Sequence, residues 1–171
     1  MNKQFLKVGL VTLMAGIYSS GASADVATGT ATAEIVSPVQ LTLATAMDFG
    51  TFAPDAAGDT VTLDAALAHN RAITTGSLVN SPTVASGAYT LSGAALAVDV
   101  AIADGTADLT NGGNTLGFTP TAPADITNGY VIGTGTDTIY VGGTLTIPAV
   151  ASAPAGTYTS AAAYTITVNY Q

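Results

Sequence analysis

The chain has 171 residues, of which only 8% are charged, and it contains neither cysteine nor tryptophan. Its formal net charge of −8 makes nucleic acids and anionic membrane surfaces poor partners. The lack of cysteine excludes disulfides, thiol chemistry and a lipid anchor on cysteine, so stability must come from packing and strand pairing.

The N-terminal residues have the order of a secretory signal peptide. Lys3 and Lys7 precede an apolar run at residues 8–18, which is too short to cross a bilayer, and a small-residue A-x-A cleavage site ends at Ala24. A buried N-terminal helix would not require this order. We therefore expect residues 1–24 to be removed and the protein to be exported to the bacterial periplasm, the cell surface or the medium.

The remaining residues, 25–171, are expected to form a single domain, because a chain of this length can bury its own core. Without residues 1–24 we expect no stable membrane span, and Arg71 is the one basic residue set against 11 acidic residues. The acids are thinly spread, which leaves strand edges without many of the charges that usually prevent edge pairing. The composition thus permits assembly by strand pairing.

Short runs of β-branched and aromatic residues, separated by Gly, Asn, Asp and Pro, predict an all-β fold. Pro38 lacks an amide donor and should interrupt the first run, and residues 66–70 are expected to form one helical turn at most. The spacing of the runs predicts an antiparallel β-sandwich. The expected strands are residues 31–44, 47–52, 60–63, 72–75, 88–92, 97–103, 115–119, 138–147 and 157–170.

Two glycine-containing segments carry specific expectations. Residues 111–114, with the sequence NGGN, tolerate positive φ and predict a hairpin turn between the strand at Ala101 and Ile102 and the strand at 116–118. Gly142 and Gly143, inside a strand-like run, predict a bulge or a bend where backbones approach closely.

The last strand has the clearest pattern in the chain. Tyr164, Ile166, Val168 and Tyr170 alternate with polar residues and share one face of a strand. We expect this face to be buried and the strand to be tied into a sheet.

Few residues suggest chemistry. His69 is the only histidine and is expected to be a solvated loop residue, because no residue pattern signals a zinc site or a Ser-His-Asp triad. The Gly-rich turns at residues 104–108 and 133–137 offer oxygen ligands for calcium, but ordinary turn chemistry explains them equally well.

A second candidate for chemistry is the acidic stretch that contains Asp48, Asp55, Asp59 and Asp64. A pair of carboxylates could serve a glycosidase, but the chain lacks tryptophan and is poor in aromatic platforms for a sugar. We therefore expect a solvated acidic loop, and we assign no catalytic, cofactor or metal residues.

Several segments together resemble the DUF4402 family of bacterial secreted proteins. They are AEIVSPVQLT at 33–42, MDFGTF at 47–52, YTLSG at 89–93, YVGGTLTI at 140–147, PAGTY at 154–158 and the final VNY at 168–170. The resemblance implies no catalytic residues. From these segments and from the pattern of the last strand, we expect structural or assembly positions at Ile35, Val39, Leu41, Phe49, Gly50, Gly142, Gly143, Tyr164, Ile166, Val168 and Tyr170.

The family in turn is similar to pilin-like subunits, which have an incomplete immunoglobulin-like sandwich, a penultimate tyrosine and an N-terminal extension that completes the next subunit. Tyr170 fits the second feature. The resemblance therefore implies an immunoglobulin-like fold and partners that are copies of this chain or related subunits, joined by strand addition.

Two functions of different class remain open. The first is a structural or adhesive surface protein, a fimbria-like subunit in which residues 31–36 or the segment before them pair with a neighbour. The second is a self-contained exported sandwich that binds a small ligand, carbohydrate or calcium through its Asp- and Gly-rich loops. An N-terminal segment outside the sheets, together with an open hydrophobic groove, would favour the first function.

Overall fold

The structure is a computed structural model and describes residues 25–105, 108–123, 126, 130–133 and 135–171. The expected signal peptide lies outside these residues. The chain divides into two units, Met1–Glu34 and Ile35–Gln171, and the second contains all the strands. In the first unit, residues 25–34 are exposed and belong to no strand. No helix in the described part of the chain is long and apolar enough to cross a membrane.

The second unit is an antiparallel, sandwich-like all-β fold, as predicted, and its described residues contain no helix. The strands are β1 Gln40–Thr45, β2 Phe52–Ala53, β3 Asp59–Leu63, β4 Arg71–Ile73, β5 Ser77–Leu78, β6 Gly87–Ser92, β7 Ala97–Asp104, β8 Leu109–Asn111, β9 Asn114–Thr121, β10 Tyr130–Val131, β11 Thr136–Ile147 and β12 Tyr164–Tyr170.

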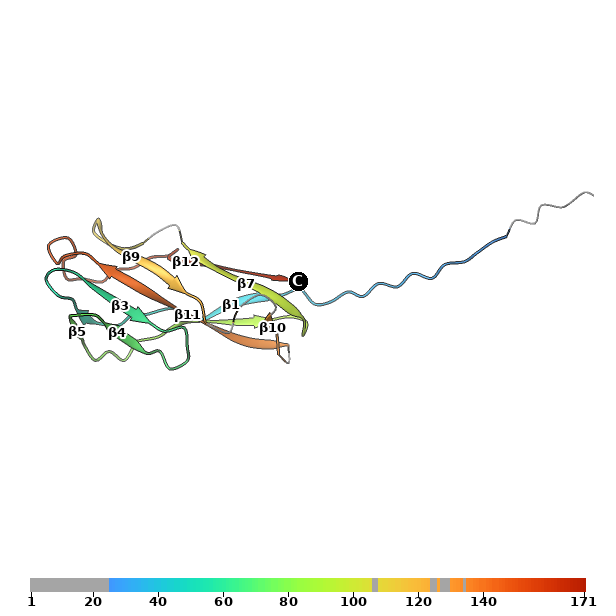
Figure 1. Ribbon diagram of the computed structural model, residues 1–171, viewed down its shortest axis with the longest axis horizontal. Helices are drawn as coiled ribbons and strands as arrows, with labels where there is room; N and C mark the ends of the chain where they lie inside the picture. The colour runs from blue at the N-terminus through green and yellow to red at the C-terminus, as the bar shows by residue number, and fades with distance from the viewer. Residues whose placement is uncertain (1–24, 106–107, 124–125, 127–129, 134) are drawn as a thin grey trace, which may run out of the picture. The chain divides into compact units, whose positions relative to one another are not determined.

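The strands form one large sheet, one small sheet and a short pair (Figure 1). The large sheet has the order β1-β6-β11-β3-β4, with β9 also on β11 and β8 on β9. The small sheet has the order β10-β7-β12, and β2 pairs with β5. Consequently β1 and β12 each have a single partner strand among the described residues.

The 12-residue strand β11 joins the two halves of the large sheet. Its first half pairs with β6 up to Val141, and from Gly143 onward it pairs with both β3 and β9. A Cβ atom on Gly142 would lie 2.3 Å from the carbonyl oxygen of Leu63, and one on Gly143 would lie 2.4 Å from the ring of Phe118. The predicted close approach of backbones at these glycines is therefore confirmed.

Two hydrophobic clusters form the core, one in each half of the sandwich. Strand β12 contributes to both, because Tyr164 packs against the first cluster and Val168 and Tyr170 against the second. The buried residues of the first are Phe49, Val61, Leu63, Leu116, Phe118, Leu145, Ile147 and Ala153. Those of the second are Leu91, Val98, Ile132 and Ile139.

The expected strands at 60–63, 72–75, 88–92, 97–103, 115–119 and 138–147 are present, with ends that differ by at most two residues. Three predictions are wrong. Residues 31–39 form no strand, residues 47–51 form only a bridge at Asp48, and residues 157–163 form only a bridge at Thr159. Apart from these two bridges, no strand of the described residues pairs with these segments.

Three short strands were not predicted, namely β5, β8 and β10. The NGGN turn has the expected positive φ at both glycines, 55° at Gly112 and 90° at Gly113, but it joins β8 to β9. The strand at residues 101 and 102, expected to form that hairpin, pairs instead with β12. Residues 66–69 form the expected single turn, in which the His69 amide donates to the Ala66 carbonyl at 3.1 Å.

We predict that Gly142→Ala destabilises the fold by about 1–3 kcal/mol, because the added methyl group overlaps backbone atoms of β3 and the residue that follows it. Gly117→Ala is the matched control, since a Cβ there lies 3.6 Å from Thr146, an ordinary van der Waals distance. Chemical denaturation followed by circular dichroism measures both. Equal stabilities of the two variants would show that the close approach at Gly142 is unimportant.

A second pair of variants tests the face of β12. Val168 is half-buried against the second cluster, so Val168→Asp should cost on the order of 2 kcal/mol of unfolding free energy. Thr167 is exposed on the opposite face, so Thr167→Asp should change stability by less than about 0.5 kcal/mol. Thermal melts of the two proteins give the comparison, and similar losses would contradict the assigned facing.

Candidate functional site

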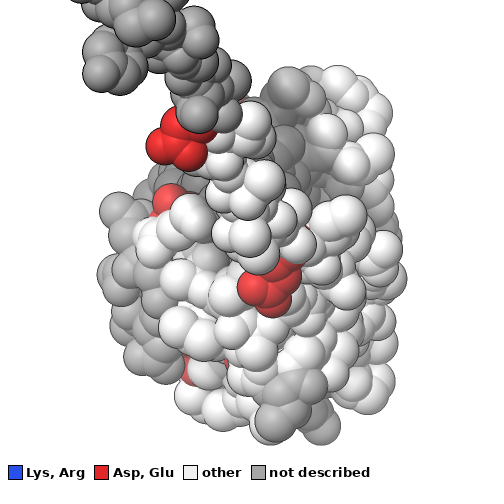
Figure 2. Space-filling view, turned by 90° about the vertical axis from the view of Figure 1, so that its right-hand side faces the viewer, with Lys and Arg blue, Asp and Glu red and all other residues white. Residues whose placement is uncertain are grey.

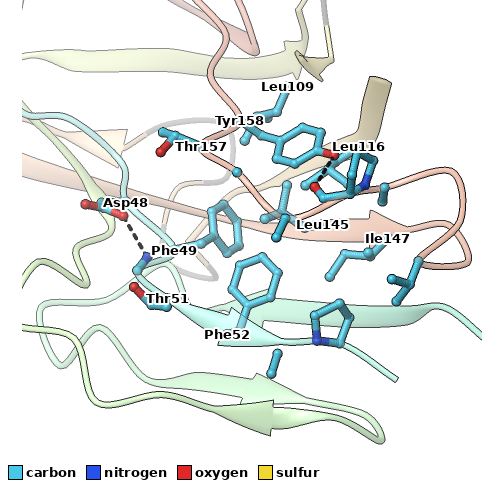
Figure 3. Close-up of a pocket in the computed structure, with 18 of the residues that line it drawn as sticks. Asp48, Phe49, Thr51, Phe52, Leu109, Leu116, Leu145, Ile147, Thr157 and Tyr158 are labelled. Carbon is cyan, nitrogen blue, oxygen red and sulfur yellow. Dashed lines mark hydrogen bonds between the residues drawn. The ribbon is translucent and has the colours of Figure 1, made fainter. Parts of the chain in front are cut away.

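The first core cluster opens to the surface through a groove formed by two adjoining cavities of about 700 and 580 Å³. Figure 3 shows Phe49, Phe52, Leu145 and Tyr158 around the larger cavity. We call the combined feature the open groove. The residues that line both cavities are Met47, Asp48, Phe49, Thr83, Leu109, Thr157 and Tyr158.

The open groove lies between two segments that are mostly outside the strands. One wall is residues 46–54, between β1 and the end of β2, and the other is residues 150–164, which lead into β12. The floor comes from the large sheet, with Leu116 on β9 and Leu145 and Ile147 on β11.

Local chemistry explains why the first wall is not a strand. The Asp48 carboxylate accepts a hydrogen bond from the Gly50 amide at 2.6 Å, and Gly50 has φ 66°, a left-handed conformation that breaks an extended chain. A Cβ on Gly50 would lie 2.8 Å from the Arg71 guanidinium. Gly50, predicted as a structural position, is thus required both by its φ and by the space around it.

Arg71 holds this wall through backbone carbonyls. Its guanidinium donates to the carbonyl oxygens of Phe49 and Thr51, the latter at 3.0 Å, and to that of Val79 at 2.8 Å. Because its guanidinium donates hydrogen bonds to three backbone carbonyls, the one arginine of the chain positions the loop that carries Phe49.

Asp59 fixes the far end of the same wall, where Ala53 and Pro54 line the larger cavity. Burial of the carboxylate raises its pKa, but hydrogen bonds from four backbone amides outweigh burial and lower the pKa from 3.8 to about 2. The donors are the amides of Thr60, Gly76, Asp55 and Thr75, at 2.6–3.2 Å.

The two tyrosines at the ends of β12 reach across the sandwich to β6 and the turn after it. Tyr89 donates a hydrogen bond to the Tyr164 hydroxyl at 2.9 Å, and burial together with this bond raises the pKa of Tyr164. A Cβ on Gly87 would lie 2.4 Å from the Tyr164 hydroxyl, and one on Gly93 would lie 2.4 Å from that of Tyr170. Glycine at both places makes room for the tyrosines.

Tyr170 also joins β12 to the segment before β1. Its hydroxyl donates to the Ser37 carbonyl at 2.8 Å and accepts from the Ala94 amide at 2.7 Å. The start of β1 and the end of β12 therefore lie at the same end of the sandwich (Figure 1).

The predicted structural positions fall into three groups. Phe49 is buried at the open groove, and Val39 and Leu41 pack, half-buried, against the second cluster. On β12 the predicted face is half-buried rather than fully buried, because this strand lies at the edge of its sheet; its members are Tyr164, Ile166, Val168 and Tyr170. Ile35 is 97% exposed and belongs to no core cluster.

Sequence reasoning missed most of the groove lining. Leu109 and Tyr158 come from segments far apart in the chain and meet only through the pairing of β8 with β9 and the bridge between Thr110 and Thr159. Leu116 and Phe118 lie in the strand expected at residues 115–119, but no local signal showed that the core beside them is open.

The residues considered for chemistry have structural partners. His69 is half-buried rather than solvated, because its Nδ1 accepts the Ser86 amide at 3.0 Å and its ring packs edge-on against Tyr140. The carboxylates of Asp48, Asp55 and Asp59 accept backbone amides, and Asp64 accepts the Asn70 side chain at 2.8 Å. Each of these four carboxylates thus accepts at least one hydrogen bond from the protein, although the second oxygen of Asp64, Oδ1, is buried without a partner.

The two candidate calcium turns lie partly outside the described residues, at 106–107 and 134. Of their described acids, Asp108 accepts the Phe118 amide at 3.2 Å, and Asp137 accepts the Tyr130 hydroxyl and the Thr138 amide. Within the described part of the chain, no group of three or more His, Asp or Glu side chains could hold a metal ion.

Asp59 gives a testable dependence of stability on pH. Because its pKa is lower in the folded than in the unfolded state, its contribution is present above pH 3.8 and is lost as the pH falls towards about 2. In thermal melts, the wild-type protein should lose stability more steeply over this range than Asp59→Asn. Asp104→Asn, which removes an exposed carboxylate, controls for the change in net charge. Parallel curves for wild type and Asp59→Asn would contradict the assignment.

Comparison with known proteins identifies the family. The model of the family described as "Domain of unknown function (DUF4402)" matches residues 39–170, so the chain belongs to that family. No curated protein and no solved structure matches the chain.

Proposed function

We propose that this DUF4402 protein is an exported structural or adhesive surface protein, a fimbria-like subunit that assembles by β-strand addition. The observation that carries the proposal is the open groove, in which the hydrophobic core is exposed between two segments that lie mostly outside the strands. Export is supported by the signal-peptide pattern of residues 1–24.

An added strand would satisfy two needs of the open groove at once. Its side chains would cover apolar surface such as Leu43, which lines the smaller cavity and is 54% exposed. Its backbone would pair with a strand edge that has no partner, as on β1 or β12. Main-chain hydrogen bonds supply affinity in this kind of recognition, and alternate side chains supply specificity.

The chemistry of these edges favours strand addition. Strands β1 (QLTLAT) and β12 (YTITVNY) contain no charged residue, whereas edge strands that must stay single usually carry lysine or other charges. Figure 2 shows an end of the molecule on which a few separate acidic side chains interrupt an otherwise uncharged described surface. A second strand would therefore meet little electrostatic repulsion.

The alternative of a small ligand, carbohydrate or calcium held by the Asp-rich loops has weaker support. The described carboxylates of those loops already accept hydrogen bonds from the protein itself. The groove lining is mainly apolar and lacks a cluster of charged groups.

The proposal predicts that Leu43→Asp prevents assembly, because it places a charge in the groove without removing a buried core residue. Leu67→Asp is the matched control, since Leu67 is 69% exposed and lines neither cavity. The full chain would be expressed with its own N-terminal residues, and polymer would be measured by electron microscopy of cells and by light scattering of the secreted fraction.

Circular dichroism melts should show that both variants remain folded. Leu43→Asp should then be monomeric, and Leu67→Asp should assemble like the wild type. Assembly of Leu43→Asp at the wild-type level would mean that the open groove is not the acceptor.

A further inference from the structure

We propose that β12 pairs with β12 of a second copy of this chain, antiparallel and about a two-fold axis at Thr167. The contact would join the small sheets of the two copies into one continuous sheet. This inference goes beyond the proposed function, because it concerns the free edge of β12 and a symmetric partner. It leaves the edge of β1 for a strand added in the open groove.

Strand β12 has the longest free edge in the described part of the fold. Its seven residues pair with β7 in an unbroken register, and no described strand pairs with its other side. The remaining edge strands carry features that limit edge pairing. Strand β1 has a register shift between Leu43 and Thr45, β4 contains Arg71, and β2, β5, β8 and β10 have only two or three residues.

The free backbone groups of β12 belong to its even-numbered residues. The Gln171 amide donates to the Ala97 carbonyl at 3.2 Å just after the strand, and the Gly105 amide donates to the Ala163 carbonyl at 2.9 Å just before it. Bonded and non-bonded pairs alternate along an antiparallel ladder, so the odd-numbered residues of β12 bond to β7. The amides and carbonyls that face away from β7 are therefore those of Tyr164, Ile166, Val168 and Tyr170.

The sequence of β12 has the same pattern in both directions. From either end of YTITVNY, the order is aromatic, polar, aliphatic, polar, and both readings meet at Thr167. Two antiparallel copies centred on Thr167 therefore place residues of the same kind beside each other in every row. The rows pair Thr167 with itself, Ile166 with Val168, Thr165 with Asn169, and Tyr164 with Tyr170.

This register suits both the backbone and the faces of the strand. Because the axis passes through an odd-numbered residue, even-numbered residues lie opposite even-numbered residues, and their free amides and carbonyls meet. The inward side chains of both copies stay on one face of the joined sheet. A slip of one residue would place the inward face of one copy beside the outward face of the other, and a slip of two would leave fewer rows paired.

The side chains at the edge favour the same contact. Ile166 and Val168 are only half-buried, so pairing would cover more of their apolar surface. The Thr167 residues would form a non-bonded pair with Cα atoms about 4.5 Å apart, close enough for their side chains to touch. The nearest acids, Asp99 and Asp104 on β7, lie opposite the ends of β12 rather than its centre. Like charges are thus absent from the axis.

A symmetric contact of this kind uses the same surface on both copies, so it closes at two. It buries one strand edge and the side chains beside it, which is small for a protein interface, and small interfaces are weak. We therefore expect a dimer that forms as the protein concentration rises and that does not extend into a filament by itself.

The symmetry is tested with charges at Thr167. The full chain would carry Leu43→Asp, which should block strand addition at the groove; this protein should be a monomer when dilute, and a dimer but nothing larger when concentrated. Adding Thr167→Asp or Thr167→Lys should keep it monomeric at all concentrations, because like charges would face each other across the axis. Thermal melts should show that both remain folded, since Thr167 is exposed.

An equal mixture of the Thr167→Asp and Thr167→Lys proteins should restore the dimer, because opposite charges then meet at the axis. Sedimentation velocity measures all of these states. A mixture that stays monomeric, or single variants that dimerise as well as their parent, would overturn the two-fold axis at Thr167.

Disulfide trapping tests the same contact in a chain that is otherwise unchanged and has no cysteine of its own. Thr167→Cys should oxidise to a covalent dimer on non-reducing gels. Ala101→Cys is the matched control, since Ala101 is exposed directly beside Thr167 on β7 and lies one strand further from the axis. Equal cross-linking of the two variants would contradict the pairing of β12 with itself.

The register has its own test. Thr165→Cys and Asn169→Cys should cross-link more readily when the two proteins are mixed than when either is alone, because these positions lie opposite each other. Stronger cross-linking of either variant with itself would overturn the proposed register.

This inference and the proposed function fail in distinguishable ways. Polymer formed by Leu43→Asp would overturn the groove as acceptor, while self cross-linking of Thr167→Cys would still support the β12 dimer. Polymer lost in Thr167→Asp alone, with no self cross-linking of Thr167→Cys, would show that the β12 edge accepts a different strand and would overturn the dimer.

Discussion

The arrangement of the sandwich depends on the close approach of β11 to its neighbours at Gly142 and Gly143. At this point β11 leaves β6 and becomes the strand between β3 and β9. Any side chain at Gly142 would overlap the backbone around Leu63 and Asp64, and any side chain at Gly143 would overlap the Phe118 ring. The two glycines thus allow one long strand to belong to both halves of the molecule. They also place Leu145 and Ile147 where they become the floor of the open groove.

The same use of glycine fixes β12 from across the sandwich. Gly87 and Gly93, at and just beyond the ends of β6, leave room for the hydroxyl groups of Tyr164 and Tyr170. Tyr164 and Tyr170 are six residues apart on β12, and Gly87 and Gly93 are likewise six residues apart in the segment that contains β6 of the large sheet. Strand β12 is therefore held at both ends by its side chains, while its backbone pairs on one side only, with β7. A strand edge that is fixed in position yet unpaired is well suited to pair with another strand, because the edge itself loses little conformational entropy on binding.

The sequence predicted the class of fold and most strands because those features are local. Alternation in β3, β6, β7 and β12 coincides with real pairing, and the glycine pair in β11 marks a real close approach. The same reasoning failed at residues 31–39, 47–51 and 157–163, which were also expected to belong to strands. A strand-like sequence indicates only that a segment can form a strand. The strand itself also needs a neighbouring strand to pair with, and each of these segments has at most a single bridge.

The candidate site was least predictable because it is a groove whose lining residues come from several distant segments of the chain. Leu109, Leu145 and Tyr158 lie in different parts of the chain, and each looks like an ordinary core residue. His69 shows the opposite error, since its polar neighbours suggested solvent, whereas the Ser86 amide and the Tyr140 ring bury part of it. The sequence did contain one sign of the open groove. More segments have the composition of a strand than there are strands in the fold with which they could pair.

Uncharged open edges are ordinarily a hazard, because any extended chain can pair with them. In the proposed assembly, selectivity must therefore come from the shape of the open groove, whose lining includes the rings of Phe49, Phe118 and Tyr158. Tyr170 adds a geometric condition. By donating a hydrogen bond to the Ser37 carbonyl at 2.8 Å, its hydroxyl holds the residues before β1 beside the end of β12, which fixes the position of both edge strands at this end of the sandwich.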